Sequence, residues 1–270
     1  MSKRPKLIAT DLDGTIVQHD GTISARTIAA FSKAHSLGVH IYFVTGRPPR
    51  WMNEIRDAFG FGEAICGNGA LLYDLKTNTV TEEWMISKEE QHEIAQRLRA
   101  AIPPISFAIE SHDYYHREKS YVPRWDIGLD NVGVERIEDA IKGPAFKMLA
   151  RCSDAEFSSD EMLEIALREL SGLVTVTHSN ARESLLEISA LGISKGETLA
   201  KVATRLGIDA SDCISFGDNP NDFSMLQWCG RSYAMADGHP DGAKYASGIA
   251  GPHATDGVAI IIEELLDLPA

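Results

Sequence analysis

The sequence predicts an α/β fold in which a parallel sheet covered by helices forms the core and an α+β domain is inserted into it. Short β-type runs alternate with amphipathic helical patterns in the first third of the chain and again after residue 195. Residues 84–190 follow a different order of helices and paired strands. A chain of 270 residues is long enough for two modest domains. We therefore expect a discontinuous core, residues 1–83 and 191–270, and an inserted domain over residues 84–190.

Composition and charge are those of a globular protein. The chain is 44% hydrophobic and 24% charged, which excludes a disordered or collagen-like protein. Its 39 acidic and 26 basic residues give a net charge of -13, which disfavours nucleic acid or an anionic membrane surface as a partner. The longest apolar run near either end, residues 258–262, is far shorter than the roughly 20 residues of a membrane helix. The basic start lacks the apolar core of a signal peptide, and the four cysteines are widely spaced, so we expect a cytoplasmic protein with reduced thiols.

The first third of the chain predicts three successive strand and helix steps. Ser24 can cap the first helix, and Gly38 can end it in a left-handed conformation. Gly60 can end the second helix in the same way. The expected strands are residues 6–10, 40–44 and 64–66, and the second helix covers about 48–59.

The pattern changes at about residue 70. Residues 70–74 and 79–83 alternate as strands and are joined by a turn-rich segment, as in a hairpin. Within the inserted segment Ser87 and Ser158 are each followed three positions later by a glutamate, which predicts a capping box at the start of two helices. This segment has 12 basic and 19 acidic residues, so it offers no basic stripe for a nucleic acid.

The alternation of the core resumes after Lys195. The expected elements are a helix at 196–206, a strand at 213–216, a helix after Pro220, and short strands at 233–236 and 247–250.

Two carboxylates follow the first expected strand, in Asp11-Leu12-Asp13-Gly14-Thr15. Ligands of open α/β sheets bind at the carboxyl ends of the strands. Alternate positions can aim Asp11 and Asp13 near one point, and Gly14 permits a close turn whose backbone N–H groups face an anion. An acidic turn that only caps a helix is the alternative.

A hydroxyl group and backbone N–H groups follow the second strand, in Val44-Thr45-Gly46-Arg47-Pro48. At the start of a helix such groups favour a phosphate or another oxyanion, although Thr45 can equally be a simple helix cap. Lys195 begins the returning core helix and can present a cation to the same strand ends, although most single lysines are solvated.

A third acidic loop, Gly217-Asp218-Asn219-Pro220-Asn221-Asp222, follows the strand at 213–216. The predicted crevice therefore combines four carboxylates with one lysine: Asp11, Asp13, Asp218, Asp222 and Lys195. Such a cluster requires a cation, and carboxylate oxygens without a Cys or His ligand pattern favour Mg²⁺. Asp222 can either bind the metal directly or support the loop behind the ligands.

These motifs, in this order, resemble the four motifs of the haloacid dehalogenase (HAD) superfamily: DLDGT, VTGR, Lys195-Gly196 and GDNPND. More narrowly, the chain is similar to the Cof-type (subfamily IIB) sugar-phosphatase branch, in which a large α+β cap lies between the second and third motifs. Asn68-Gly69-Ala70 resembles the element that precedes the cap in such proteins. The resemblance implies a HAD-like Rossmannoid catalytic core and assigns the inserted domain as the cap that selects the substrate.

The resemblance also implies a role for each motif residue. Asp11 would be the nucleophile and Asp13 the general acid and base. Mg²⁺ would be held by Asp11, by the backbone carbonyl of Asp13 and by Asp218, with Asp222 behind them. Thr45, Gly46, Lys195 and Asn221 would hold the phosphate.

The chemistry independently supports these roles. A carboxylate nucleophile divides hydrolysis into an aspartyl-phosphate step and a water step, while a second acid protonates the leaving alcohol and later deprotonates the water. Mg²⁺ and Lys195 would offset the charge on the transferring phosphoryl group, which makes Lys195 part of the catalytic set.

We therefore expect a Mg²⁺-dependent phosphatase that hydrolyses small phosphomonoesters, such as sugar phosphates or related metabolites, through an aspartyl-phosphate intermediate. A phosphomutase of the same superfamily shares these motifs and remains an alternative. A non-enzymatic phospho-acceptor or binding protein is a second alternative, against which Asp13 and the inserted domain argue. The sequence predicts neither the natural substrate nor the oligomeric state.

The inserted domain offers candidate substrate contacts, for each of which an ordinary surface or core role is the alternative. The cations that can meet a second anionic group are Arg117, Lys119, Arg124, Lys147 and Arg182. The aromatic residues that can stack on a sugar or base are Tyr114, Tyr115 and Trp125.

Overall fold

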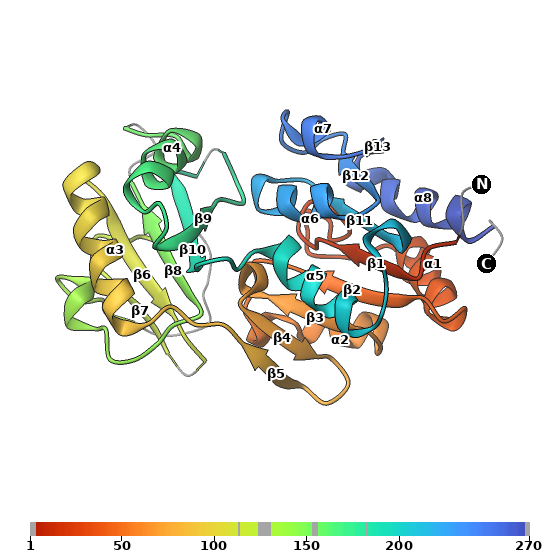
Figure 1. Ribbon diagram of the computed structural model, residues 1–270, viewed down its shortest axis with the longest axis horizontal. Helices are drawn as coiled ribbons and strands as arrows, with labels where there is room; N and C mark the ends of the chain where they lie inside the picture. Colours follow the sequence, from red (N-terminus) through yellow and green to blue (C-terminus); the bar gives the residue numbers. More distant parts are fainter. Residues whose placement is uncertain (1–3, 113, 124–130, 153–155, 182, 268–270) are drawn as a thin grey trace. The chain divides into compact units, whose positions relative to one another are not determined.

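The chain divides into two compact units in a computed structural model that describes residues 4–112, 114–123, 131–152, 156–181 and 183–267 (Figure 1). The core unit is Met1–Glu82 with Ser194–Ala270, and the cap unit is Glu83–Ile193. These divisions lie close to the expected boundaries at residues 83 and 191. The catalytic role of the core and the substrate-selecting role of the cap remain predictions.

The core unit is built on an eight-stranded sheet with the order β13-β12-β11-β1-β2-β3-β4-β5. The strands from β13 to β3 are parallel, and β4 runs antiparallel to β3. The chain leaves β1 toward β2 on one side and later returns to β11 on the other, so a topological switch point lies at the carboxyl end of β1. The strands are β1 Leu7–Thr10, β2 His40–Val44, β3 Glu63–Cys66, β4 Leu71–Asp74, β5 Thr79–Glu83, β11 Cys213–Gly217, β12 Arg231–Met235 and β13 Gly248–Ala250.

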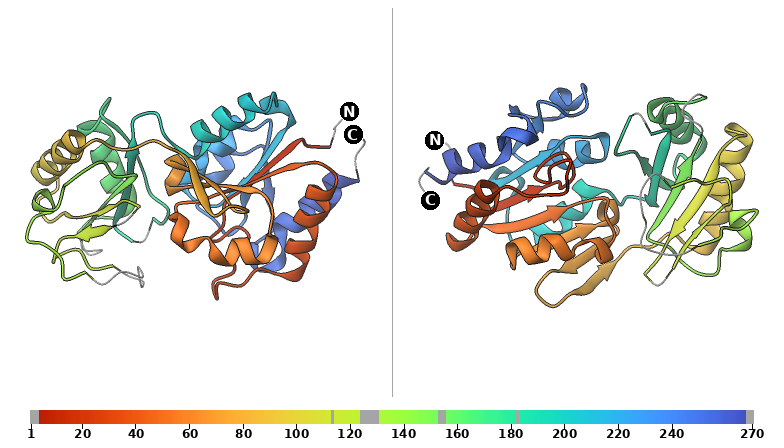
Figure 2. Two further views of the ribbon diagram at one scale, coloured as in Figure 1. Left: turned by 90° about the horizontal axis from the view of Figure 1, so that it is seen from below. Right: turned by 180° about the vertical axis from the view of Figure 1, so that it is seen from behind.

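Helices cover both faces of this sheet (Figure 2). On one face the buried strand residues Leu7 and Val44 lie in a hydrophobic cluster with Leu199 of α5 and Met225 of α6. On the other face α1 and α2 contribute Phe31 and Phe59, which pack around Phe43 of β2 with ring centroids 6.0 and 4.7 Å away. The helices are α1 Ala25–Ser36, α2 Asn53–Phe59, α5 Lys195–Arg205, α6 Phe223–Trp228, α7 Gly242–Tyr245 and α8 Gly257–Leu266. The predicted α/β class with a parallel-sheet core is confirmed.

Local signals set several helix boundaries. The Ser24 side chain accepts a hydrogen bond from the Thr27 N–H at the start of α1, and Gly60 ends α2 with φ 67°. The expectation of one helix over residues 48–59 is wrong at its start. A separate 3₁₀ turn, Pro49–Trp51, precedes α2, because the N–H groups of Trp51 and Met52 bond to the carbonyls three residues back rather than four.

The cap unit is a five-stranded antiparallel sheet with the order β7-β6-β8-β10-β9. Two helices pack on it, and both begin with the expected capping box, at Ser87 with Glu90 and at Ser158 with Glu161. The elements are α3 Lys88–Ala101, β6 Ser106–Glu110, β7 Tyr115–Arg117, β8 Lys147–Arg151, α4 Ser159–Glu169, β9 Val174–Thr177 and β10 Leu185–Ala190.

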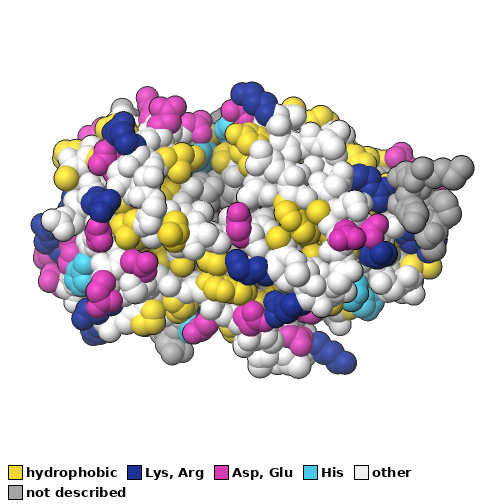
Figure 3. Space-filling view, viewed as in Figure 1, with side chains coloured by type: hydrophobic (Ala, Val, Ile, Leu, Met, Phe, Trp, Pro, Cys, Tyr) yellow, Lys and Arg dark blue, Asp and Glu magenta, His cyan; other side chains and the backbone are white. Residues whose placement is uncertain are grey.

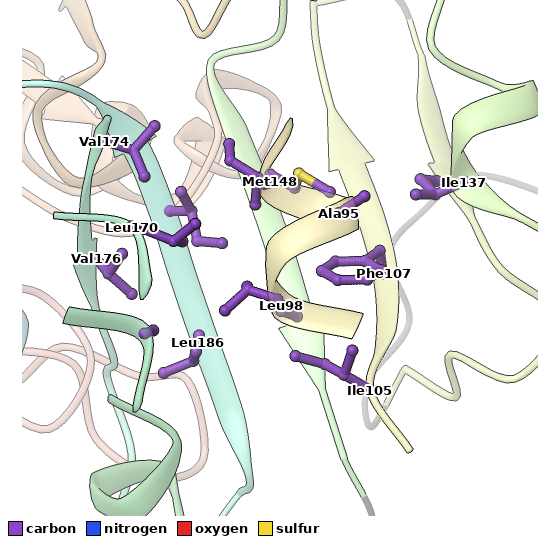
Figure 4. Close-up of a cluster of buried hydrophobic side chains, with 14 of the residues drawn as sticks. Ala95, Leu98, Ile105, Phe107, Ile137, Met148, Leu170, Val174, Val176 and Leu186 are labelled. Carbon is purple, nitrogen blue, oxygen red and sulfur yellow. The ribbon is translucent and has the colours of Figure 1, made fainter. Parts of the chain in front are cut away.

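The cap unit has a hydrophobic core of its own. Leu98 of α3, Phe107 of β6, Met148 of β8 and Leu186 of β10 are fully buried in one cluster between helices and sheet (Figure 4). Because side chains alternate along a strand, the other face of the sheet carries polar residues, among them the buried Lys147.

The surface mixes charges of both signs. On the face shown in Figure 3, basic side chains are scattered among acidic ones, and those drawn in colour form no continuous basic stripe. Within the described ranges, no helix is both long enough and apolar enough to cross a bilayer.

Replacing Leu98 by Ala is expected to lower the free energy of unfolding by about 2–5 kcal/mol, because the fully buried side chain would leave a cavity. Urea unfolding followed by circular dichroism measures this loss. Leu167→Ala, in a side chain that is 55% exposed on α4, is the matched control and should change stability by about 0.5 kcal/mol or less. Equal losses in the two variants would contradict the assignment of this core.

Candidate active site

The motif loops of the core unit meet at the carboxyl ends of three neighbouring strands, β2, β1 and β11. The Asp11 N–H donates to the Phe216 carbonyl at 2.9 Å, which joins the loop after β1 to the end of β11. The Thr45 N–H donates to the Ile65 carbonyl at 2.8 Å, which joins the loop after β2 to β3. The parallel sheet therefore brings together residues that are about 200 positions apart in the sequence.

A buried lysine lies at the centre of this site. Nζ of Lys195, at the first position of α5, lies 2.6 Å from Oδ1 of Asp11 and 2.6 Å from Oδ1 of Asp222. The side chains of Lys195 and Asp222 are fully buried, and that of Asp11 is 7% exposed. Burial alone would lower the pKa of Lys195, but the attraction of Asp11 and Asp222 outweighs it and raises that pKa. Lys195 is therefore a permanent cation between two carboxylates.

Asp222 supports the acidic loop on which it lies. Its Oδ2 accepts hydrogen bonds from the N–H groups of Asp218 at 3.0 Å and Asn219 at 3.1 Å, while its Oδ1 accepts from Lys195. Both oxygens are thus engaged by the protein. Of the two roles left open by the sequence, this geometry favours support of the loop from behind.

The carboxylates of this site repel one another. One carboxylate oxygen each from Asp11, Asp218 and Asp222 lies within 4.8 Å of the others. Burial raises the pKa of Asp11 to about 7, opposed by Lys195 and helped by the charges of Asp222 and Asp13. Burial and the charges of Asp11 and Asp222 raise the pKa of Asp218 well above its ordinary value. Three carboxylates against one lysine leave an excess of negative charge, and the hard oxygens of Asp11 and Asp218 fit a divalent cation such as Mg²⁺.

Gly14 allows the first and last motif loops to approach each other. Its φ is +81°, and a Cβ at this position would lie 2.5 Å from Oδ2 of Asp218. A side chain here would be strained by the backbone and would collide with a proposed metal ligand.

Asp13 lies apart from the three clustered carboxylates. Its side chain is 58% exposed, and Arg47 binds it with two hydrogen bonds, Nε to Oδ2 at 2.8 Å and Nη2 to Oδ1 at 2.5 Å. The sequence indicated no role for Arg47, although this residue belongs to the VTGR motif. The bidentate pair fixes the orientation of Asp13.

The loop after β2, which is predicted to bind phosphate, lies within the site. Thr45 is 1% exposed, and its hydroxyl oxygen accepts a hydrogen bond from the Arg47 N–H at 3.0 Å. The carbonyl of Thr45 accepts from the Asn68 N–H at 3.0 Å. The Asn221 Nδ2 in turn donates to Oδ1 of Asn68 at 3.1 Å. The site thus gathers Asp11, Thr45, Lys195, Asp218, Asn221 and Asp222, and adds Asn68, for which the sequence indicated no contact.

The cap candidates that the structure describes are held by other parts of the protein. Arg117 donates to the backbone carbonyls of Glu118, Tyr121 and Asn131 at 2.9–3.2 Å. Lys119 pairs with Glu135. The buried Lys147 lies 3.6 Å from Glu110 and 3.4 Å from Glu187. These contacts do not favour a second anion at these three cations. Arg124, Trp125 and Arg182 lie outside the described residues.

The ring candidates of the cap differ in exposure. Tyr115 is buried on β7, whereas the hydroxyl of the half-buried Tyr114 donates to the Pro144 carbonyl at 3.3 Å. Tyr115 is therefore part of the cap structure, and Tyr114 is the more accessible of the two rings.

Fold and site together define an α/β enzyme with an acidic, lysine-containing site at a topological switch point. The sequence model for the haloacid dehalogenase-like hydrolases matches residues 8–262, and the chain belongs to this family.

Curated relatives match over nearly the whole chain. Pyridoxal phosphate phosphatase YbhA of Escherichia coli is 26% identical over 270 residues, which cover 95% of this chain and 97% of the relative. The 5-amino-6-(5-phospho-D-ribitylamino)uracil phosphatase YitU of Bacillus subtilis is 24% identical over 283 residues, covering 99% of this chain and 100% of the relative. The prediction of a HAD-type phosphatase is confirmed at the level of the family.

Solved structures of HAD proteins share this fold. The structure of the HAD subclass IIB sugar phosphatase BT4131 superposes with a TM-score of 0.78 and 21% identity, covering 96% of this chain and 98% of the other. This likeness agrees with the predicted Cof-type fold.

Mg²⁺ is expected to stabilise the protein more at pH 8 than at pH 5.5. Because the folded-state pKa of Asp11 lies near 7, above its ordinary 3.8, the metal-free fold loses stability as the pH rises from about 4 to about 7. A bound cation removes this penalty above pH 7, whereas protons compete with it at pH 5.5. In differential scanning fluorimetry, Mg²⁺ at ten times its dissociation constant should raise the melting temperature by roughly 3–6 °C at pH 8.

Two variants test where Mg²⁺ binds. Asp218→Asn changes a proposed metal ligand, and the control Asp57→Asn changes an exposed side chain of α2. Asp218→Asn should lose most of the Mg²⁺ shift, and Asp57→Asn should keep it. An equal shift at both pH values, or a full shift in Asp218→Asn, would show that the cation binds elsewhere.

Proposed function

We propose that the protein is a Mg²⁺-dependent phosphatase that hydrolyses small phosphomonoesters through an aspartyl-phosphate on Asp11. The observation that carries this proposal is the contact of buried Asp11 with Lys195, next to the Thr45 loop. Burial raises the pKa of Asp11 to about 7, and Lys195 opposes a further rise, so the ionised carboxylate that can attack phosphorus is present from neutral pH upward. A purely structural ion pair would not require two further carboxylates at the same point.

In the first step the Asp11 carboxylate attacks the phosphorus atom and the ester bond to the leaving oxygen breaks. Asp13 donates a proton to that oxygen, so the product leaves as an alcohol. In the second step the Asp13 carboxylate takes a proton from water, whose oxygen attacks phosphorus and releases Asp11 and inorganic phosphate. Asp13 is accessible for this exchange because its carboxylate is more than half exposed, and one of its oxygens must leave Arg47 to carry the proton.

The remaining motif residues bind the phosphoryl group. We assign the Thr45 hydroxyl, the Gly46 N–H, the Lys195 ammonium and the Asn221 amide to its oxygens. Asp11, Asp218 and the Asp13 carbonyl would hold Mg²⁺, which supplies positive charge to the same oxygens when bound. Asp222 keeps Lys195 and the loop of Asp218 in place.

The substrate is proposed to be a small metabolite with a single phosphate, and the cap to select it. Relatives are named for pyridoxal phosphate, for a phosphoribitylamino-uracil and for sugar phosphates. Because Arg117, Lys119 and Lys147 are engaged by acceptors within the cap, we expect no second phosphate of the substrate to bind at these three cations. The four buried cysteines, Cys66, Cys152, Cys213 and Cys229, form no disulfide among the described residues, which supports a reducing, cytoplasmic compartment.

Asp11→Asn is expected to reduce turnover by about 10³-fold or more while the fold is kept, because the amide cannot form the phosphoenzyme. Phosphate release is measured on a panel of sugar phosphates, pyridoxal phosphate and phosphorylated flavin precursors, with Mg²⁺ or with EDTA. Asp20→Asn, in an exposed loop residue, is the control and should be fully active.

Three outcomes of this assay would contradict the proposal. Phosphate release without Mg²⁺ would show that the metal is not required, and turnover by Asp11→Asn would show that Asp11 is not the nucleophile. An isomerised sugar phosphate with little free phosphate would identify a phosphomutase.

Asp13→Asn is expected to lower kcat/KM by about 10²–10⁴-fold for an alkyl phosphate. The loss should be smaller for 4-nitrophenyl phosphate, because 4-nitrophenolate can leave without a proton. Steady-state kinetics with both substrates measures the difference. An equal loss for the two leaving groups would assign the proton transfer to another residue.

A further inference from the structure

Asn68 occupies a strained turn at the edge of the site. It lies between Gly67 and Gly69, directly after β3, with φ 57° and ψ 32°, a left-handed conformation that few side chains other than Asn adopt. It is 2% exposed. Of the four non-glycine residues with positive φ in the described chain, only Asn68 bonds to the predicted phosphate loop.

The Asn68 turn contacts three motif segments at once. Its N–H donates to the carbonyl of Thr45 at 3.0 Å, and its Oδ1 accepts from Nδ2 of Asn221 at 3.1 Å. The next residue, Gly69, accepts a hydrogen bond from the Thr198 hydroxyl at 2.8 Å, one turn after Lys195 on α5. A Cβ at Gly69 would lie 2.3 Å from the Ser194 carbonyl oxygen, so this packing has no space for a side chain.

The Asn68–Asn221 pair leaves hydrogen-bonding capacity unused inside the site. Nδ2 of Asn68 and Oδ1 of Asn221 are both buried without a hydrogen-bond partner in the described structure. Turning both carboxamides by 180° exchanges the bonded atoms and again leaves one N–H group and one carbonyl oxygen without a partner. Buried polar groups of this kind are rare in proteins, because each destabilises the fold unless a ligand or water satisfies it.

We propose that Asn68 is a phosphate-binding residue, whose amide fixes Asn221 through one hydrogen bond while the free N–H of the pair donates to an oxygen of a tetrahedral phosphate. This inference rests on the proposed function and assigns one more residue to its phosphate site. The free carbonyl oxygen of the pair can accept a hydrogen bond from the P–OH group that inorganic phosphate carries at neutral pH. The backbone N–H of Asn68 bonds to the Thr45 loop, while its buried amide contacts Asn221 rather than solvent.

Inorganic phosphate is the probe, titrated by isothermal calorimetry into the full chain with Mg²⁺ present. Asn68→Gly keeps the positive φ and removes the amide, so the dissociation constant should rise about 10-fold. Asn68→Asp keeps the shape and places a carboxylate beside the anion, so the rise should reach about 100-fold. The matched controls are Asn78→Gly and Asn78→Asp, at φ 59° in the turn between β4 and β5, and both should bind phosphate as the wild type does.

The order wild type, Asn68→Gly, Asn68→Asp of decreasing affinity supports the proposal. Unchanged affinity in either folded variant would overturn it, and loss of fold in both would show that the turn is structural. If no phosphomonoester is hydrolysed but the order holds, the proposed function fails and the phosphate site stands. If hydrolysis occurs and the variants bind normally, the function stands and Asn68 has no part in it. A wild type that binds no phosphate refutes both.

Discussion

The organisation of the core unit depends on burying one lysine between two carboxylates. A charged ammonium removed from water is strongly destabilising unless opposite charges contact it, and Lys195 is fully buried with Asp11 and Asp222 at 2.6 Å each. These three residues come from the end of β1, the start of α5 and the loop after β11. The ion pairs therefore require that the chain, after building the whole cap, returns α5 to the same edge of the sheet.

Much of this arrangement could be predicted because it depends on short-range rules. Parallel strands place their carboxyl ends on one edge, so Asp11, Thr45 and Asp218 could be grouped from the strand pattern alone. The contacts of Arg47 with Asp13 and of Asn68 with Asn221 could not, because they depend on side-chain rotamers and on a left-handed turn that no spacing reveals. The α-helix expected from residue 48 begins only at Asn53, because Pro49–Trp51 form a 3₁₀ turn whose shorter hydrogen bonds the apolar spacing does not distinguish from those of an α-helix.

The cap was the least predictable part, and its charges explain why. From the sequence, Lys147 is a candidate cation for an anionic substrate. In the structure, Glu110 and Glu187 on the two neighbouring strands lie on the same face of the sheet and pair with it. Register across an antiparallel sheet decides which charges meet, and register is not visible in a single sequence. The cap also has its own hydrophobic core, so we expect substitutions on its polar face to leave the proposed catalytic residues of the core unit undisturbed.

The charges of the proposed site couple the binding of the phosphate ester to the binding of a cation. Burial is the main cause of the raised pKa values of Asp11 and Asp218, and the excess negative charge of three clustered carboxylates over one lysine adds to it. A phosphate ester adds more negative charge at the same point, so its binding and the binding of a cation must reinforce each other. The donors proposed at Thr45, Gly46 and the two asparagines would orient the phosphate, but being neutral they would not offset that charge. Affinity for the ester should therefore follow the occupancy of the metal site, whereas its orientation should follow the amides.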